Sequence, residues 1–473
     1  MQFNSLVFII FAIIFFALWP ILRRGNNRRW IYLVVASFIF YGWWDWRFLF
    51  LIIGSGLIDF FAGMAMVRFP SKRKLLLILS LIGNIGSLSI FKYLDFGIHN
   101  VNWLFHLFGM DAQLPSAHLI LPVGISFYTF QSMSYTIDVY RGQLTPTRNI
   151  FHFFAYLALF PQLVAGPIVR ARDLLPQLET YKPITEQQRW DGLNLIAFGF
   201  FKKVVVADTL AATVNTAFGA QTLTDSAGYW WVVMIMFAFQ IYCDFSGYSD
   251  IARGLGKWMG YEFPVNFRNP YIASSFQEFW QRWHISLSTW FRDYVYIPLG
   301  GSREGKFRAH TNMWITMLIS GLWHGAAWTF IMWAAVHSLY LSIERTTNWP
   351  KRLGKLPAGR HLATLAVFLF TIVAWVFFRA ENFSQALAVL GTMFNFANFN
   401  SSLIHSLIDN NAINVLLIIV GSQLFFYLGM DKADWATSTS GFKTAVDTIF
   451  IAIIIMTCIF MRAPTNTFIY FQF

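Results

Sequence analysis

The sequence predicts an all-α polytopic membrane protein of about ten transmembrane helices, with re-entrant and in-plane amphipathic helices between them. Of its 473 residues, 56% are hydrophobic and only 12% are charged, about half the charged fraction of a soluble domain. Apolar runs of about 18 residues or more recur along the chain, each long enough to cross about 30 Å of hydrocarbon as a helix. The strands of a β-barrel would instead alternate in polarity, so helices are favoured.

The positive charge is a topology signal and does not indicate nucleic acid. The net charge is +12, but the Lys and Arg residues cluster at the ends of apolar runs, as the positive-inside rule describes for cytoplasmic loops. The two cysteines, Cys243 and Cys458, both lie in apolar runs, so neither a disulfide framework nor a zinc site is predicted. Neither an HExxH motif nor paired CxxC motifs occur, and no metal is expected.

The apolar runs and their basic flanks predict the order of the spans. The first run has no basic segment before it and is followed by Arg23, Arg24, Arg28 and Arg29, so we expect an uncleaved helix with its N-terminus outside. A polar stretch without Lys or Arg, residues 95–118, is expected on the outer side, as is the C-terminal tail. The single predicted spans are residues 2–22, 30–44, 48–67, 75–91, 119–137, 193–218, 230–245, 362–378, 412–428 and 445–460.

Two further apolar runs do not fit single crossings. Residues 151–169 have basic residues on both sides and are broken by FPQLVAGP, which favours a re-entrant element. Residues 313–343 are longer than one span needs and also have two basic flanks. We therefore expect an even number of crossings or a hairpin there, bent near the glycines of GLWHG (321–325).

The long inner segment, residues 253–310, contains FWQRWHISLSTWFRD (279–293). At 3.6 residues per turn this stretch predicts an in-plane amphipathic helix at the cytoplasmic surface, with tryptophans at headgroup depth. His284 would lie at the border of the two faces, beside Gln277, Gln281 and Ser288. A plain interfacial anchor with a hydrogen-bonding border histidine is the alternative. The predicted apolar stripe is Phe276, Trp280, Trp283, Leu287, Trp290 and Phe291, and the opposite face carries Glu278, Arg282, Thr289 and Asp293.

His324 lies within the apolar run 313–343, in the sequence Trp323-His324-Gly325. An ionisable residue at membrane depth is costly and indicates function, with an inward-facing partner. Gly321 and Gly325 alternatively mark close helix packing. His337 is expected to be an interface residue near the end of the run.

Other chemistry is weakly indicated or absent. The carboxylates of YCDFSGYSD (242–250) lie at a span end and either line a polar cavity or cap a helix. Neither a GxSxG nucleophile elbow nor a GxxxxGK[ST] phosphate loop occurs. Any group transfer must therefore draw its energy from an activated substrate.

The segment NFRNPYIASSFQEFWQRWHISLSTWFRDYVYIPLGGSR (266–303), with GLWHGAAWTF (321–330), resembles the signature region of the membrane-bound O-acyltransferases, in particular their bacterial alginate O-acetylation branch. The RWHxS and WHG combination is highly specific. The resemblance implies one integral-membrane domain over residues 1–473, with its signature region at 266–345, and helices arranged around a central tunnel. It extends to LPVGISFYTFQSMSYTIDVYRG (121–142), LFPQLVAGPIVRARDLLPQL (159–178), YCDFSGYSDIARGLG (242–256), WVFFRAENF (375–383) and FIYFQF (468–473).

The resemblance implies that His324 is the principal catalytic histidine and His284 the second active-site residue. A neutral imidazole can take the proton from an acceptor hydroxyl that attacks a thioester carbonyl, while a second imidazole stabilises the charge that develops on oxygen. The implied donor is acetyl-CoA, a substrate and not a bound cofactor, which cytoplasmic Arg and Lys residues would attract. Candidates for the tunnel or donor side are Trp323, Gln281, Arg282, Ser288, Asp293 and Arg170, with Arg172, Arg268 and Arg303 as further arginines.

Relatives of this branch acetylate polysaccharide outside the bacterial inner membrane with the help of a periplasmic, SGNH-like O-acetyltransferase. The expected partners are therefore that enzyme, other polysaccharide-biosynthesis subunits and membrane lipid, but no nucleic acid. The acceptor is expected to be of alginate, cellulose or peptidoglycan type. Tyr470 in the outward tail FIYFQF is a candidate acyl relay, and an aromatic interface anchor is the alternative.

Two function classes compete with the enzyme. A channel or transporter for an acyl or glycan carrier would line a path with polar groups, although no inverted repeat supports a transporter. A non-catalytic scaffold of a polysaccharide-modification complex would depend on its surface loops. In neither case would His324 be essential for group transfer.

Overall fold

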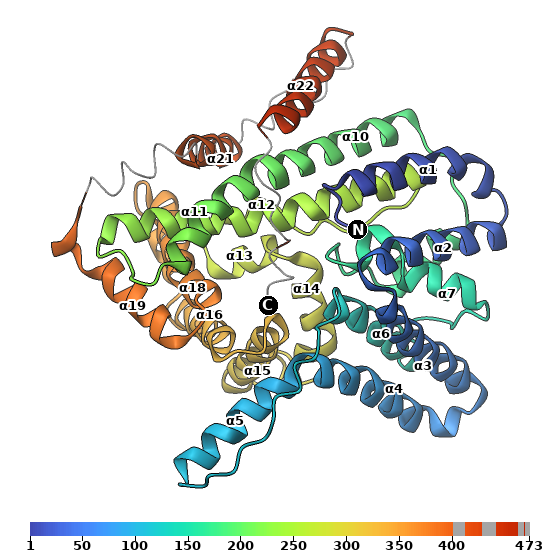
Figure 1. Cartoon of the computed structure of the whole chain (residues 1–473), viewed down its shortest axis with the longest axis horizontal. Helices are drawn as coiled ribbons and strands as arrows, with labels where there is room; N and C mark the ends of the chain where they lie inside the picture. The colour runs from blue at the N-terminus through green and yellow to red at the C-terminus, as the bar shows by residue number, and fades with distance from the viewer. Residues whose placement is uncertain (401–411, 428–440, 462–467, 469–473) are drawn as a thin grey trace. The chain divides into compact units, whose positions relative to one another are not determined.

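Helices and turns make up all of the regular structure in the computed structural model, which describes residues 1–400, 412–427, 441–461 and 468 (Figure 1). The all-α prediction is confirmed for these residues. The chain divides into two compact units, residues 1–193 with 251–264, and residues 194–250 with 265–473. The expectation of a single domain over residues 1–473 stays a prediction.

Four helical stretches among the described residues are long and apolar enough to cross a membrane. The count of about ten crossings stays a prediction. The four stretches are Asn26–Arg68, Pro70–Leu107, Ala227–Met259 and Gly359–Arg379, and shorter apolar helices occur at Leu6–Leu22, Phe383–Met393, Asn414–Leu424 and Thr448–Phe460.

Unit 1 holds the N-terminal helices and the end of α12. The helix α10 contributes residues to both units. The elements are α1 (Leu6–Leu22), α2 (Asn26–Asp45), η1 (Trp46–Phe48), α3 (Leu49–Arg68), η2 (Pro70–Lys72), α4 (Arg73–Leu88), η3 (Ser89–Tyr93), α5 (Leu94–Leu107), α6 (Ile125–Tyr140), α7 (Ile150–Leu157), α8 (Phe160–Leu163), α9 (Ala171–Glu179) and α10 (Glu186–Phe200).

The predicted hairpin of unit 1 is present as α2 and α3, joined by the single turn η1. The sequence predicts a polar outer stretch at residues 95–118 and no helix in it. In the structure, the helix α5 covers the first part of this stretch and ends at Leu107. The next predicted span begins later than expected, at Ile125. In the region predicted to be re-entrant, α7 and α8 are each too short to cross a bilayer, since a crossing needs about 20 residues.

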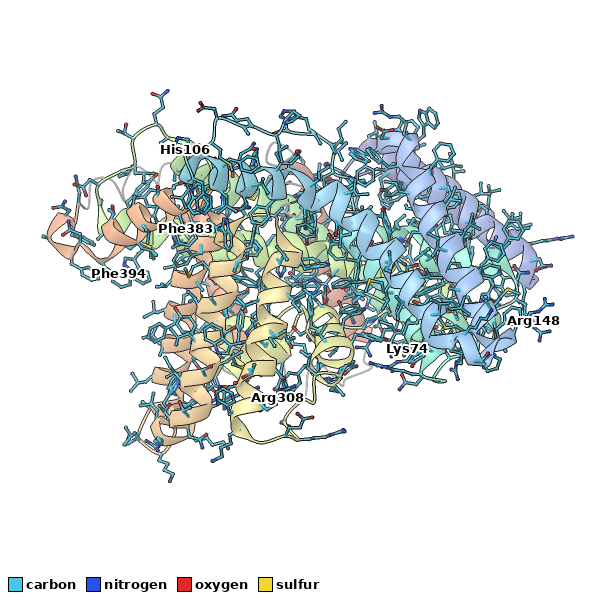
Figure 2. The ribbon with its side chains drawn as sticks, turned by 90° about the horizontal axis from the view of Figure 1, so that it is seen from below. Lys74, His106, Arg148, Arg308, Phe383 and Phe394 are labelled. Atoms are coloured by element: carbon cyan, nitrogen blue, oxygen red, sulfur yellow. The ribbon has the colours of Figure 1, made fainter. Side chains whose placement is uncertain are left out.

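The basic residues at the start of α4 lie beside the end of α6. Arg73, at the start of α4, donates from Nη2 to the carbonyls of Val139 (3.1 Å) and Tyr140 (2.6 Å), at the end of α6. Figure 2 shows Lys74 and Arg148 toward one edge of this unit and His106 toward the opposite edge. This arrangement agrees with the orientation that the positive-inside pattern predicts.

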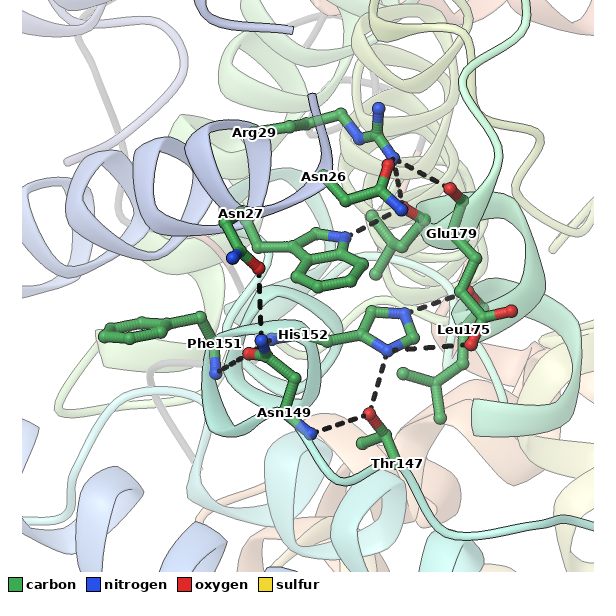
Figure 3. Close-up of polar contacts among 11 residues, drawn as sticks. Asn26, Asn27, Arg29, Thr147, Asn149, Phe151, His152, Leu175 and Glu179 are labelled. Atoms are coloured by element: carbon green, nitrogen blue, oxygen red, sulfur yellow. Dashed lines mark hydrogen bonds and ion pairs between the residues drawn. The ribbon is translucent and has the colours of Figure 1, made fainter. Parts of the chain in front are cut away.

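One arginine of the first basic loop has a structural role. Arg29 is only 1% exposed, and its Nη2 donates to the carbonyls of Leu178 (2.6 Å) and Glu179 (3.1 Å) (Figure 3). The indole of neighbouring Trp30 donates to the same Leu178 carbonyl (2.8 Å) and stacks on His152, with ring centroids 4.4 Å apart. These contacts join α2, α7 and the end of α9, because the guanidinium satisfies carbonyls that a helix end leaves without partners.

A second polar cluster joins α3, α4 and α6. Asp59 is buried and accepts hydrogen bonds from the hydroxyls of Ser80 and Ser132 and from Asn84 Nδ2, the last at 2.8 Å. Polar contacts of this kind join helices in a membrane, where hydrophobic contact alone gives little preference over lipid.

Unit 2 contains the stretch 279–293 and both candidate catalytic histidines. Its elements are η4 (Phe201–Ala207), α11 (Asp208–Gly219), α12 (Ala227–Met259), η5 (Pro270–Ile272), α13 (Phe276–Arg282), α14 (Ile285–Phe291), η6 (Arg292–Tyr296), α15 (Lys306–His324), α16 (Trp328–Thr347), α17 (Trp349–Leu353), α18 (Gly359–Arg379), α19 (Phe383–Phe394), η7 (Phe396–Asn398), α21 (Ala412–Tyr427) and α22 (Gly441–Phe460).

The hairpin predicted for residues 313–343 is confirmed. It consists of α15 and α16, which lie side by side and are separated by a three-residue break after His324 (Figure 1). A methyl group on Gly321 would lie 2.5 Å from the Phe330 carbonyl oxygen and 2.6 Å from the Ala334 Cβ. The absence of a side chain at Gly321 therefore allows the two backbones to approach. In Figure 2, Arg308 of α15 lies at one end of this unit's hairpin and Phe383 of α19 at the other.

We expect Gly321→Ala to destabilise the protein by about 1–3 kcal/mol, since the methyl group would overlap backbone atoms that cannot move independently. Thermal unfolding in detergent measures the change. Gly391→Ala is the matched control, because a Cβ at that position of α19 meets no atom within 4 Å. The control should unfold at or slightly above the wild-type temperature, and an equal unfolding temperature for both variants would contradict the close packing of α15 on α16.

Candidate active site

The inner segment is not one amphipathic helix, as the sequence predicted, but two short helices that meet at His284. Trp283 is extended, and His284 has left-handed backbone angles of φ 42° and ψ 54°. The aromatic residues are also not at a lipid surface. Phe279 and Trp283 are buried in the protein, where Trp283 contacts the rings of Phe267 (5.1 Å) and Trp375 (5.0 Å).

Asn266 satisfies the backbone at this break. Its carbonyl accepts from the Ile285 N–H (2.9 Å), and its side-chain Oδ1 accepts from the Ser286 N–H (3.2 Å) and hydroxyl (2.9 Å). A left-handed residue that is not glycine costs free energy and persists only where its surroundings hold it. Here the buried asparagine supplies the hydrogen bonds that a continuous helix would have made internally.

The same asparagine determines which nitrogen of His284 carries the proton. The Ser286 N–H can only donate, so the Asn266 atom it contacts is oxygen, and Nδ2 is the atom that donates to Ser249 Oγ (3.1 Å). His284 Nδ1 lies 3.1 Å from that oxygen, so Nδ1 carries the hydrogen. In the neutral ring, Nε2 is then the acceptor nitrogen.

His284 lies in an apolar pocket of rings. Its side chain is only 1% exposed, and its ring contacts Phe245 edge to face (4.5 Å) and Trp323 (6.2 Å). Burial lowers the pKa of His284 to about 3, since the charged form loses its hydration there. The imidazole is therefore neutral at physiological pH. It lies inside the protein.

His324 is the last residue of α15, and it lies next to the same tryptophan. It is 3% exposed, and its ring contacts Trp323 (5.0 Å), Trp333 (5.0 Å) and Phe378 (5.4 Å). The chain turns sharply after it because Gly325 has no side chain: a Cβ there would lie 2.0 Å from a ring carbon of Phe330. Trp323 thus contacts both histidines, each of which occupies a break between two helices.

A cavity of about 390 Å³ lies along α13, α14, α15 and α16, within the size range of small-molecule sites. Its wall combines apolar residues with hydroxyls, amides and two exposed arginines, Arg292 and Arg345. The lining residues are Gln277, Trp280, Gln281, Ile285, Leu287, Ser288, Thr289, Phe291, Arg292, Tyr296, Met313, Thr316, Met317, Ser320, Leu341 and Arg345.

The family model of the membrane-bound O-acyltransferases matches residues 143–385, about half of the chain. The chain is also 43% identical over 408 residues to the probable alginate O-acetylase AlgI of Pseudomonas putida, an alignment that covers 85% of this chain and 82% of that protein. The chain belongs to the membrane-bound O-acyltransferase family. It is therefore an acyltransferase and, with its apolar helices, a multi-pass membrane protein.

Other relatives in this family carry different names. The peptidoglycan O-acetyltransferase of Helicobacter pylori is 37% identical over 391 residues, which are 77% of this chain and 73% of that protein. The teichoic acid D-alanyltransferase of Streptococcus thermophilus is 28% identical over 305 residues, or 56% of this chain and 72% of that protein. Different acyl groups and acceptors are thus named among relatives of one membrane O-acyltransferase fold.

The structure groups some of the candidate site residues of this acyltransferase. Gln281 and Ser288 line the cavity, whereas Arg282 forms an ion pair with Glu278 (2.8 Å). Asp293 forms an ion pair with Arg292 (2.7 Å) and so lies next to a lining residue.

The sequence named two further candidates. Arg170 is buried in unit 1, at the N-terminus of α9. Tyr470 lies outside the described residues.

The carboxylates of YCDFSGYSD neither cap a helix nor line the cavity. Asp244 lies 2.8 Å from Lys203 Nζ, which also contacts Asp208 (2.9 Å), and Asp250 lies 2.7 Å from Lys202 Nζ. Both lysines belong to the π-helical turn η4. They form ion pairs, and the sequence showed them only as two lysines inside an apolar run.

Sequence reasoning missed three residues near the site. The arginines Arg292 and Arg345 were not among the candidates, although both flank the predicted apolar segments. His337 was expected at an interface but is fully buried among aromatic rings. The signal in the sequence was its spacing of four residues from both Trp333 and Leu341, which places it on an apolar face of a helix.

We expect Asn266→Ala to lower both the unfolding temperature and the acyl-transfer rate, because the break at His284 would lose its acceptor and leave buried donors without partners, at about 1–3 kcal/mol each. Unfolding in detergent and a transfer assay measure the two effects. Ser249→Ala is the matched control, since it removes only the contact on the far side of the Asn266 amide. It should lower the unfolding temperature less than Asn266→Ala does, and its acyl-transfer rate should stay near that of the wild type, because the hydrogen bonds at the break remain. Wild-type stability and transfer in Asn266→Ala would show that the break does not depend on this residue.

Proposed function

We propose that this acyltransferase takes acetyl from cytoplasmic acetyl-CoA and passes it across the bacterial inner membrane for O-acetylation of an extracytoplasmic polysaccharide, through a periplasmic partner enzyme. The observation that carries the proposal is the pair of buried histidines on either side of Trp323, within a chain whose relatives include a probable alginate O-acetylase and a peptidoglycan O-acetyltransferase. An acceptor of alginate or peptidoglycan type fits those two names, and we propose cellulose as the third alternative.

In the proposed reaction His324 acts as the general base. It takes the proton as an acceptor hydroxyl oxygen bonds to the acetyl carbonyl carbon, the carbon–sulfur bond breaks, and the proton passes to the departing thiolate. The apolar rings around His324 keep water from competing as the acceptor. No metal is required, because the thioester is already activated.

The tautomer of His284 bears on its role. A ring whose Nδ1–H donates to Asn266 presents Nε2 as an acceptor. This favours a role in orienting the acceptor hydroxyl, because steadying a negative oxygen needs a hydrogen-bond donor. The charge-stabilising role expected from the sequence would require the imidazolium, which the lowered pKa of His284 disfavours.

The cavity supports an anionic donor with a long, partly apolar arm. Arg292 and Arg345 are exposed at its wall, while Leu287, Met313 and Met317 provide apolar surface. Arginine favours phosphate because its planar group binds two oxygens at once. The two arginines thus suit the phosphates of acetyl-CoA, and we propose that the donor enters here from the cytoplasm.

The C-terminal tail supports an acyl relay through Tyr470. Phe468, two residues before it, is buried in unit 2 and contacts the rings of Phe245 (5.7 Å) and Tyr248 (5.3 Å). Phe245 in turn contacts His284. Two residues of extended chain span at most about 7 Å, so we propose Tyr470 as the relay, with a plain interface anchor as the alternative. We further propose that both termini are periplasmic, so that the relay delivers acetyl to the SGNH-like partner.

We expect His324→Ala to abolish transfer of radiolabelled acetyl from acetyl-CoA by the purified protein in proteoliposomes, with and without the periplasmic partner, because the acceptor hydroxyl loses its base. General-base catalysis contributes about 10²–10⁴-fold. The exposed His106, at the end of α5, provides a matched histidine-to-alanine control that should retain full activity. Equal transfer by wild type and a folded His324→Ala would instead support a channel or a scaffold.

We expect Tyr470→Phe to stop polysaccharide acetylation in the presence of the partner, because phenylalanine keeps the ring but has no oxygen to carry an ester. Mass spectrometry of the wild-type tail should detect an added acetyl group when the partner is omitted. Full acetylation of the polysaccharide by Tyr470→Phe would refute the proposed relay.

A further inference from the structure

The cavity and His324 are connected by two helical faces. On α16, residues four apart lie on one face, so Arg345 and Leu341 of the cavity wall continue into His337 and then Trp333. On α15, the lining residue Ser320 lies one turn before His324. Both faces of the hairpin therefore lead from the cavity toward the catalytic histidine.

Three adjoining rings occupy the way between them: Trp280, His337 and Trp333, here called the indole–imidazole row. Trp280 lines the cavity, and its ring lies 5.2 Å from that of His337. His337 lies 5.1 Å from Trp333, and Trp333 lies 5.0 Å from His324. The row thus begins at the cavity wall and ends against the candidate catalytic residue.

The polar atoms of this row make no hydrogen bond to the part of the chain that the structure describes. Trp280 Nε1, both ring nitrogens of His337 and Trp333 Nε1 are buried and have no hydrogen-bond partner among the described residues. His337 and Trp333 are both 0% exposed. Leaving a buried donor or acceptor unsatisfied is costly, and nearly all such groups in proteins are paired. Four atoms of this kind, on three rings in contact between a cavity and a candidate catalytic residue, indicate a binding site for a polar ligand.

We propose that the indole–imidazole row binds the amide groups in the arm of the thioester donor and so positions the thioester at His324; this inference rests on the proposed function. Each indole donates one hydrogen bond, and a neutral imidazole donates one and accepts one. Carbonyl oxygens and an amide N–H match that set. His337 is a positioning residue in this proposal, since it binds the arm and not the reacting atoms.

The spacing agrees with the chemistry of coenzyme A. Its pantetheine arm carries two amides, and the nearer one is separated from the sulfur by two methylene groups. The row places His337 one helical turn from Trp333, a rise of about 5.4–6 Å along α16. A thioester beside Trp333 and His324 would therefore have its first amide near His337 and its second near Trp280, while the phosphates remain toward Arg292 and Arg345.

The test compares two unreactive competitors of acetyl-CoA in the proteoliposome assay. S-methylpantetheine carries both amides but no phosphate, and adenosine 3′,5′-bisphosphate carries phosphates but no amide. The variants are His337→Phe and Trp280→Phe, which keep an aromatic ring and remove the polar nitrogens, and His337→Gln, which restores one donor and one acceptor. Ser338→Ala is the matched control, because that buried hydroxyl of α16 already donates to the Ala334 carbonyl within its own helix.

We expect His337→Phe to raise the KM for acetyl-CoA and the inhibition constant of S-methylpantetheine about tenfold each, as the loss of a hydrogen bond predicts. The kcat at saturating donor should fall less, and the inhibition constant of adenosine 3′,5′-bisphosphate should not change. Trp280→Phe should act in the same direction, His337→Gln should restore part of the loss, and Ser338→Ala should resemble wild type.

Three results would overturn the inference. The first is an unchanged inhibition constant of S-methylpantetheine in His337→Phe. The second is an equal loss of affinity for both competitors in that variant, which a purely structural role predicts. The third is a wild type that does not bind S-methylpantetheine. In each case wild-type transfer from acetyl-CoA would persist and the proposed function would stand. A folded wild type that transfers no acetyl from acetyl-CoA would refute the proposed function itself, and this inference with it.

Discussion

The hydrogen bonds that Asn266 makes to the chain at His284 are the contacts on which the candidate site most depends. The side-chain oxygen and the main-chain carbonyl of this residue together satisfy the break between α13 and α14. In a buried, apolar setting a broken helix is tolerated only where its freed backbone groups find partners. The same oxygen fixes the proton of His284 on Nδ1, so a single residue determines the position of the backbone, the orientation of the ring and the direction of its lone pair.

His324 depends on a steric constraint of a different kind. Glycine at positions 321 and 325 lets α16 return directly against α15, and the turn between them leaves His324 at a helix end, among the rings of Trp323, Trp333 and Phe378. Rings on all these sides exclude water and lower the local dielectric. In such a setting a neutral imidazole and a few fixed dipoles act more strongly than they would in water. A site for an activated thioester needs this exclusion, because water is the competing acceptor.

Polar side chains also hold unit 1 together. Arg29 bonds the carbonyls at the end of α9, and Asp59 collects hydroxyl and amide donors from α4 and α6. For helices that contact lipid, burying apolar side chains against a neighbour gains little over contact with hydrocarbon, so small residues and hydrogen bonds supply much of the specificity. The indole–imidazole row of unit 2 differs from these clusters, because its nitrogens have no partners among the described residues.

The sequence by itself determined the membrane class, the positions of most helices and the hairpin around GLWHG, and it supplied the two histidines as candidates, because apolar length, flanking charge and short motifs are local properties. Only the tertiary structure showed that the helix breaks at His284. The aromatic spacing of residues 276–291 fits a continuous helix, and the partner that breaks it, Asn266, lies outside that period. The cavity arginines, the lysine–aspartate pairs and the burial of His337 were likewise decided by contacts between segments distant in the chain. A periodic pattern shows which face of a helix is apolar, but not whether lipid or another helix covers that face, and this choice determines which polar atoms remain available for a substrate.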